Sequence, residues 1–162
     1  MLSENKGITV VSGLWNIGKE NRPFDHYLES FSKFLDLEVN MVLFLPKSLE
    51  ELVWKKRSKD NTKIVNFELA KIREIFSPFW ANVEKIRNDE KWKSQAAWLR
   101  NSPQANLEWY NPIVMSKVSL LHDASIYNYF NDEYFIWLDA GISNTVNIDT
   151  LQGDFFSKLK PL

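Results

Sequence analysis

The feature that most constrains the fold is an alternation of short apolar runs with amphipathic segments over residues 8–67. Short apolar or β-branched runs predict strands, and apolar residues spaced three or four apart predict helices. This alternation favours a parallel sheet with covering helices, because right-handed crossovers join parallel strands in that way. We therefore predict an α/β fold with an open, mainly parallel sheet and flanking helices. Its first three strands are expected at Ile8–Ser12, Asn40–Leu45 and Thr62–Phe67.

Helices are predicted between and after these strands. Ser48 followed by Glu51 is a capping-box pattern that opens a helix through about Lys56. Pro78 is expected to divide a later helical segment, because proline removes a backbone donor. The predicted helices are Phe24–Leu37, Ser48–Lys56, Ala70–Phe76, Phe79–Arg87, Lys91–Leu99, a segment beginning at Asn111-Pro112, and Ala124–Phe130.

A fourth strand is predicted at Tyr134–Asp139, within the stretch YFIWLDAG. Five of its first six residues are apolar or aromatic, which predicts a strand covered on both faces. We expect this strand and Ile8–Ser12 to lie near the centre of the sheet. Beyond Gly141 the pattern weakens, so that residues 142–147 suggest one more extended piece and residues 148–162 an irregular tail.

The fourth strand ends at a carboxylate, Asp139, followed by the small residues Ala140 and Gly141. In an open parallel sheet, ligands bind beyond the carboxyl ends of the strands. Asp139 could therefore hold a metal ion or a sugar hydroxyl, with small neighbours that let the ligand approach. The alternative is a buried strand followed by a common Asp-x-Gly turn, and this segment alone favours the turn.

The loop after the first strand carries two glycines, Gly13 and Gly18, which let backbone approach a ligand. Its spacing matches neither a dinucleotide fingerprint nor a phosphate loop. Trp15 could equally stack on a base or plug the sheet edge. Because this loop and Asp139 both follow the carboxyl ends of parallel strands, we expect them to face one crevice.

Composition narrows the function classes. The 162 residues suit one domain, and 44% hydrophobic and 14% aromatic residues can fill a sizeable core. A net charge of −1 without a basic stripe gives no general attraction for nucleic acid, and the run Lys55-Lys56-Arg57 is interpreted as a helix end that favours cations. No apolar run is long enough to span a membrane, and the start MLSENKG lacks the pattern of a signal peptide, which predicts a cytoplasmic protein.

The chain is poor in soft metal ligands and thiols. It has no cysteine, which excludes disulfides, thiolate zinc sites and a thiol nucleophile. His26 and His122 are too few for a histidine-built metal site. Any metal would therefore need oxygen ligands, as magnesium, manganese and calcium prefer.

Several stretches together resemble the HtrL/YibB family of bacterial proteins, which includes WlaTC-like proteins of surface-polysaccharide loci. They are ITVVSGLWNIG, YLESFSKFL, MVLFLP, EWYNPIVMSKVSLL and FIWLDAGISNTV, in this order over residues 8–146. The family is regarded as glycosyltransferase-like and related to the nucleotide-sugar transferase fold called GT-A. The resemblance implies that residues 1–162 correspond to the N-terminal, nucleotide-binding half of such an enzyme, since members of the family continue past the Asp-x-Gly strand.

The resemblance also implies roles for particular residues. The first strand and its loop would hold the nucleotide through Val11, Ser12, Gly13 and Trp15. The Asp-x-Asp motif that holds a divalent cation in GT-A enzymes corresponds to Asp139-Ala140-Gly141, where glycine replaces the second acid.

One carboxylate makes a weaker magnesium or manganese site than two, although Asn144 could add an oxygen ligand. Lys117 and Arg100 are the candidate basic residues near the donor. From the residues alone, Lys117 is more readily a solvated lysine on the flank of a helix whose Val114, Val118 and Leu121 line one face.

The function implied by the resemblance is transfer of a sugar from a nucleotide-sugar donor to a cell-surface glycan of lipopolysaccharide, lipooligosaccharide or capsule type. Asp139 would hold a manganese or magnesium ion, Lys117 would offset the charge of the diphosphate, and no catalytic base is assigned. Peripheral membrane contact would suit such an acceptor. The alternatives are a half-domain that binds a nucleotide or sugar without turnover and a truncated, inactive remnant.

Overall fold

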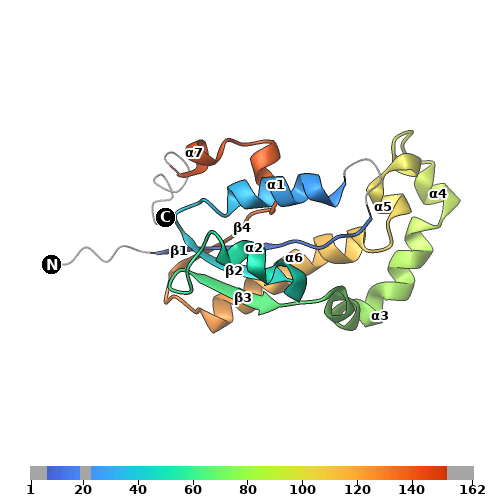
Figure 1. Ribbon diagram of the computed structural model, residues 1–162. Helices are drawn as coiled ribbons and strands as arrows, with labels where there is room; N and C mark the ends of the chain where they lie inside the picture. The colour runs from blue at the N-terminus through green and yellow to red at the C-terminus, as the bar shows by residue number, and fades with distance from the viewer. Residues whose placement is uncertain (1–6, 19–22, 153–162) are drawn as a thin grey trace.

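The computed structural model describes residues 7–18 and 23–152. Its four strands form one parallel sheet in the order β3-β2-β1-β4 (Figure 1). The predicted α/β fold with a parallel sheet is therefore confirmed, and all four strands form where they were expected. They are β1 (Ile8–Gly13), β2 (Asn40–Leu45), β3 (Thr62–Asn66) and β4 (Tyr134–Trp137).

The prediction that two strands lie near the centre of the sheet is right for β1 and wrong for β4. β1 lies between β2 and β4, but β4 is an edge strand of the described sheet, and its four residues are only half-buried. Its apolar sequence has another cause. Phe135 and Trp137 pack in a cluster on one face of the sheet, whereas Leu138 packs in the cluster on the other face. The run is apolar because both faces are covered, and this pattern gives no information about the strand's neighbours along the sheet.

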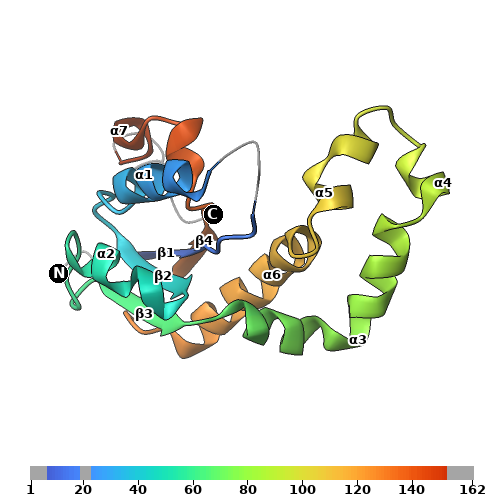
Figure 2. The same cartoon turned by 45° about the vertical axis from the view of Figure 1, so that its right-hand side comes forward.

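Helices cover both faces of the sheet, in three layers (Figures 1 and 2). On one face, α1 (Phe24–Phe34) and α2 (Glu50–Trp54) contribute Phe31, Phe34 and Val53 to the core. On the other face, α3 (Leu69–Arg87) and α6 (Tyr110–Tyr127) pack with Trp15 and Phe67. No helix in the described ranges is both long enough and apolar enough to span a membrane.

The predicted break at Pro78 is wrong, because α3 continues through it from Leu69 to Arg87. Proline takes away the backbone donor that would reach the carbonyl of Glu74, and the Ser77 hydroxyl donates to that carbonyl instead, at 3.0 Å. The helix changes direction partway along its length in Figure 2. A bend with a replacement donor therefore takes the place of a break.

Other helix boundaries also differ from prediction. Ser48 makes no capping bond, and a 3₁₀ turn, η1 (Lys47–Leu49), follows Pro46 and precedes α2. The helix expected over 91–99 is limited to α4 (Glu90–Lys93), since the Ser94 hydroxyl donates to the carbonyl of Lys91 and competes with the helical pattern. It is followed by η2 (Leu99–Asn101) and α5 (Pro103–Asn106).

The helix expected over Ala124–Phe130 is not separate, because α6 runs on to Tyr127 and ends at Asn128 in the left-handed conformation. The predicted face of α6 is also wrong: Val118 is 75% exposed, and Val114 is 43% exposed. The buried row consists of Pro112, Ser116, Leu120 and Ala124. Apolar residues occur all round this helix, so their spacing did not reveal the row on which small residues allow close contact.

The segment after β4 is helical where an extended piece was expected. η3 (Ile142–Asn144) lies against α1, because Ser143 donates to the backbone carbonyl of Ser30 at 2.9 Å. A short helix, α7 (Ile148–Thr150), follows at the start of the expected irregular tail. Residues 153–162 of that tail lie outside the described residues.

The segment from the end of α3 through α5 extends away from the sheet in both views. Its base is held by aromatic and ionic contacts. Trp80 packs edge-on against Trp109 with ring centroids 5.1 Å apart, and Arg73 lies over the Trp80 ring. The guanidinium of Arg87 binds Glu84 and the carbonyl of Ala105, which joins α3 to α5.

Candidate functional site

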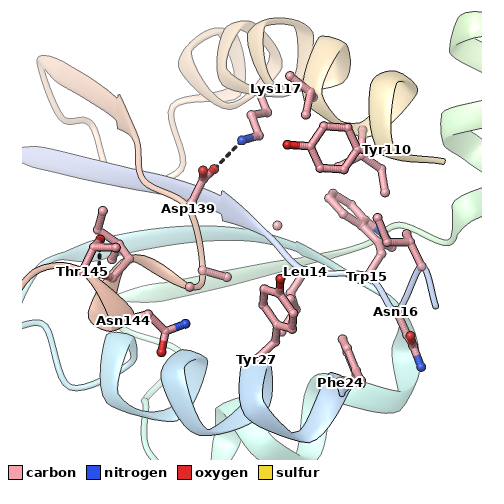
Figure 3. A pocket seen from close by; sticks show the side chains of 17 residues that line it. Leu14, Trp15, Asn16, Phe24, Tyr27, Tyr110, Lys117, Asp139, Asn144 and Thr145 are labelled. Carbon is pink, nitrogen blue, oxygen red and sulfur yellow. Dashed lines mark hydrogen bonds and ion pairs between the residues drawn. The ribbon is translucent and has the colours of Figure 1, made fainter. Parts of the chain in front are cut away.

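A cavity of about 340 Å³ opens at the carboxyl ends of β1 and β4 (Figure 3). The loop after β1 and Asp139 both line it, which confirms the prediction that they face one crevice. Helices α1 and α6 and the segment after Asp139 through η3 supply the remaining walls. The lining residues are Gly13, Leu14, Trp15, Asn16, Ile17, Phe24, Tyr27, Tyr110, Ile113, Val114, Lys117, Asp139, Ala140, Gly141, Ile142, Asn144 and Thr145.

An ion pair in the cavity joins Lys117 of α6 to Asp139, just after β4. The Lys117 ammonium lies 2.6 Å from Oδ1 of Asp139, and the indole Nε1 of Trp137 donates to the same oxygen at 2.8 Å. The ammonium also lies 5.9 Å from the centroid of the Trp137 ring. Asp139 is therefore tied to α6 through its side chain, a contact that the turn interpretation did not anticipate.

Trp15 closes one wall of the cavity but is largely buried. Its Nε1 donates to the carbonyl of Phe67 at 2.7 Å, and its ring packs edge-on against the Phe67 ring. Only 7% of its surface is exposed. Of the two roles left open by the sequence, the geometry favours the plug over the stacking platform.

Position 13 needs a glycine because the Trp15 ring occupies the space where a Cβ atom would lie. A Cβ atom at Gly13 would lie 2.4 Å from the Trp15 ring and 3.1 Å from the carbonyl oxygen of Phe44. A Cβ at Gly141 would meet nothing closer than 3.6 Å. The first glycine is required by internal packing, whereas the second leaves room at the cavity.

These two glycines give a matched pair of substitutions. Gly13→Ala is expected to lower the free energy of unfolding by about 1–3 kcal/mol, because the Trp15 ring must shift away from its site. Gly141→Ala is expected to change it by no more than about 0.5 kcal/mol. Urea denaturation followed by tryptophan fluorescence measures both, and equal losses of stability for the two variants would contradict this account of Gly13.

Asn144 presents its amide nitrogen to the cavity. Its Oδ1 accepts a hydrogen bond from the Ser30 hydroxyl of α1 at 2.5 Å. Nδ2 is then the group on the cavity side, 3.6 Å from where a Cβ of Gly141 would lie (Figure 3). Asn144 is therefore arranged as a hydrogen-bond donor and not as the oxygen ligand that the sequence suggested.

Three of the eight predicted donor-binding residues do not line the cavity. Val11 is fully buried in the core, and the Ser12 hydroxyl donates to the carbonyl of Leu138 at 2.6 Å, which joins the ends of β1 and β4. Arg100 lies on η2 and forms an ion pair with Glu90 at 2.7 Å. The other five line it: Gly13, Trp15, Lys117, Asp139 and Gly141.

The sequence interpretation missed the aromatic walls. Tyr27 of α1 and Tyr110 of α6 reach into the cavity from opposite sides (Figure 3). Tyr110, Val114 and Lys117 are four and three residues apart and so lie on one face of α6. That spacing was a usable signal, because a lysine on an aromatic and apolar stripe is a candidate for the wall of a pocket.

The side chains around Asp139 do not fit the divalent-cation site that the resemblance implies. Magnesium and manganese take several oxygen ligands. In the described ranges no three histidine or acidic side chains cluster in a way that could hold a metal ion. The Oδ1 atom of Asp139 already accepts from Lys117 and Trp137, and an ammonium so close would repel a cation.

Comparison with known proteins gives a family but no activity. No curated protein and no solved structure matches the chain significantly. A family model described as "Bacterial protein of unknown function (HtrL_YibB)" matches residues 6–155. The match covers all four strands and the whole cavity wall. The chain therefore belongs to the HtrL/YibB family of bacterial proteins.

Proposed function

We propose that this chain binds a nucleotide sugar in the cavity and acts as a glycosyltransferase toward a cell-surface glycan. One observation carries the proposal: a basic side chain and aromatic walls meet at the carboxyl ends of parallel strands. This is the place where open α/β sheets bind their ligands. Lys117 supplies a positive charge there, while Tyr27 and Tyr110 face each other across the cavity.

Each part of a nucleotide sugar has a matching part of the cavity. A base has a flat π-face that suits the tyrosine rings. A diphosphate suits the Lys117 ammonium and the Asn144 amide donor, since charge-assisted hydrogen bonds are the strong ones. A volume of about 340 Å³ is within the range of small-ligand pockets. The acceptor glycan would approach from the open side.

A second candidate function is recognition of a nucleotide or sugar without turnover. The observation that favours it is the Lys117–Asp139 ion pair, because an oxygen of the acid that lines the cavity is already occupied by the Lys117 ammonium. Binding is common to both functions, and release of the nucleoside diphosphate separates them.

The test is a thermal-shift screen of nucleotide sugars, followed by an assay for nucleoside diphosphate release. A ligand at about 100 times its dissociation constant stabilises by about 2.7 kcal/mol. For a chain of this size this stabilisation raises the melting temperature by roughly 5–10 °C. Each sugar is tested with manganese and with a chelator, because the resemblance implies a cation.

Two tryptophan substitutions on α6 locate the binding site. Val114 lines the cavity, and Val118 lies one turn further along and is 75% exposed. Val114→Trp is expected to fill the cavity and abolish the thermal shift, whereas Val118→Trp is expected to preserve it. A shift that survives Val114→Trp would place the ligand elsewhere, and no shift with any nucleotide sugar would refute the proposed function.

A further inference from the structure

The charge that lines the cavity is balanced. Among the described residues of its wall, Lys117 and Asp139 are the charged ones, and their side chains form an ion pair. A diphosphate that enters the cavity meets both an ammonium that attracts it and a carboxylate that repels it. Binding must therefore compete with Asp139 for Lys117.

The pair is held from two sides, which fixes where the ammonium lies. Lys117 projects from α6, and Asp139 follows β4. Trp137 donates its indole N–H to the same carboxylate oxygen and lies close to the ammonium. The ammonium therefore occupies a defined position at the cavity wall. Without these contacts, the flexible lysine side chain would place its ammonium in many positions.

We propose that Lys117 replaces a divalent cation as the partner of the diphosphate, and that Asp139 is the positioning residue that holds Lys117 in place. A nucleoside diphosphate then binds this cavity without a metal ion. The inference rests on the proposed function. It is supported by the donor set: one carboxylate with two hydrogen-bond donors on Oδ1, glycine in place of a second acid, and an asparagine that presents its nitrogen.

Asp139→Asn separates the positioning role from a metal-binding role by the sign of its effect. Asparagine keeps an oxygen that accepts from Lys117 and Trp137 but carries no charge. If Asp139 only positions Lys117, the loss of its negative charge should tighten binding of a diphosphate by about three- to tenfold. If Asp139 holds a cation, the same substitution should weaken binding in manganese.

Two further variants complete the set. Lys117→Met keeps much of the side-chain length and should weaken binding by about ten- to a hundredfold, because a charged hydrogen bond is lost. Asp139→Ala removes the acceptor as well as the charge, and so should bind less tightly than Asp139→Asn. The matched controls are Glu51→Gln and Lys55→Met, which remove the same charges from an exposed ion pair on α2 and after it.

The experiment is calorimetric titration of UDP, GDP and inorganic pyrophosphate into each protein, with manganese and with EDTA. Circular dichroism confirms that each variant is folded. Support consists of wild-type binding that is equal in EDTA and manganese, with tighter binding by Asp139→Asn and unchanged binding by both controls. Lys117→Arg should retain most of the affinity, which excludes a merely structural effect of Lys117→Met.

Two results would overturn the inference, and they have different consequences for the proposed function. Binding that requires manganese and is lost in Asp139→Asn would make Asp139 a cation ligand and leave the proposed function intact. No binding of any of the three probes under either condition would refute the proposed function together with the inference.

Discussion

Replacing Arg57 with methionine is expected to lower the free energy of unfolding by about 3–5 kcal/mol, more than any other single substitution considered for this protein. The reason is the number of backbone groups that one guanidinium satisfies. Its nitrogens donate to the Thr62 hydroxyl at 2.6 Å and to a cluster of carbonyls just after α1 and before β3. These carbonyls belong to Leu35, Leu37, Val39 and Asn61.

Burial explains why this loss is large. It lowers the pKa of the Arg57 guanidinium from its ordinary value, and the neighbouring carboxylate of Asp36 opposes the change. Methionine fills similar space but removes the donor of the Leu35 and Val39 carbonyls, whereas the carbonyls of Leu37 and Asn61 keep a bond from a backbone N–H. A buried acceptor that loses its donor is not rehydrated, which is the main cost of the substitution. The guanidinium stays charged throughout the working pH range, so the loss should not depend on pH between about 5 and 9.

Lys56→Met is the matched control for Arg57→Met. The Lys56 ammonium forms an ion pair with Asp36 at 2.8 Å, with side chains 31% and 58% exposed. Surface pairs of this kind contribute little, so its loss should cost no more than about 1 kcal/mol. Urea denaturation of both variants measures the difference, and similar unfolding midpoints would show that the carbonyl cluster does not depend on Arg57.

The interpretation of Lys55-Lys56-Arg57 from the sequence shows one limit of prediction. The three basic residues do follow a helix, as expected. Nothing in their order indicates that the third alone turns inward, because its partners are backbone carbonyls up to 22 residues away. Composition and periodicity describe side chains, and they contain no information about unsatisfied backbone groups in distant segments.

The sheet could be predicted because each strand carries its own signal. Short runs that are rich in β-branched and apolar residues and flanked by turn residues favour strands, and all four were located. The position of β4 at the edge could not be predicted in this way, since its neighbours along the sheet are set by how segments far apart in the sequence pack.

The helices are less well predicted for a related reason. Val114 and Val118 were expected on one buried face of α6, yet one lines the cavity and the other is exposed. A helix with apolar residues on every side can be rotated at little cost in local propensity. The row that is buried includes Leu120 and Ala124, which pack with Val11 of the sheet, and these contacts are tertiary.

The candidate site could be predicted less completely than the sheet but better than the helices. Lys117 and Asp139 could each be identified from the sequence, and the structure brings them within 2.6 Å. Tyr27 lies within the helix predicted over Phe24–Leu37, where an aromatic residue at helical spacing is usually buried against a sheet. It lines a cavity because the loop after β1 and the turn after β4 leave space beside α1, which no local pattern shows.

Reversing the charge of Lys117 should have the largest effect on binding. Lys117→Glu is expected to weaken nucleoside diphosphate binding by about two to three decades, compared with one to two for Lys117→Met. The additional loss comes from repulsion, since a second carboxylate would face Asp139 at the cavity wall and both would repel the diphosphate. Titration of UDP and inorganic pyrophosphate in EDTA measures this difference.

Exchanging the two charges tests whether the effect is electrostatic. The Asp139 side chain is 58% exposed and that of Lys117 is 27% exposed, so both ends of the pair can accept a different side chain without burying an unpaired charge. The double variant Lys117→Glu/Asp139→Lys should recover the melting temperature, because the ion pair re-forms. It should also recover at least about tenfold of the lost affinity, because one ammonium again lies at the wall. If the double variant binds no better than Lys117→Glu although it is folded, the ammonium must act from α6 alone; if Lys117→Glu binds as tightly as wild type, the diphosphate does not lie at this pair.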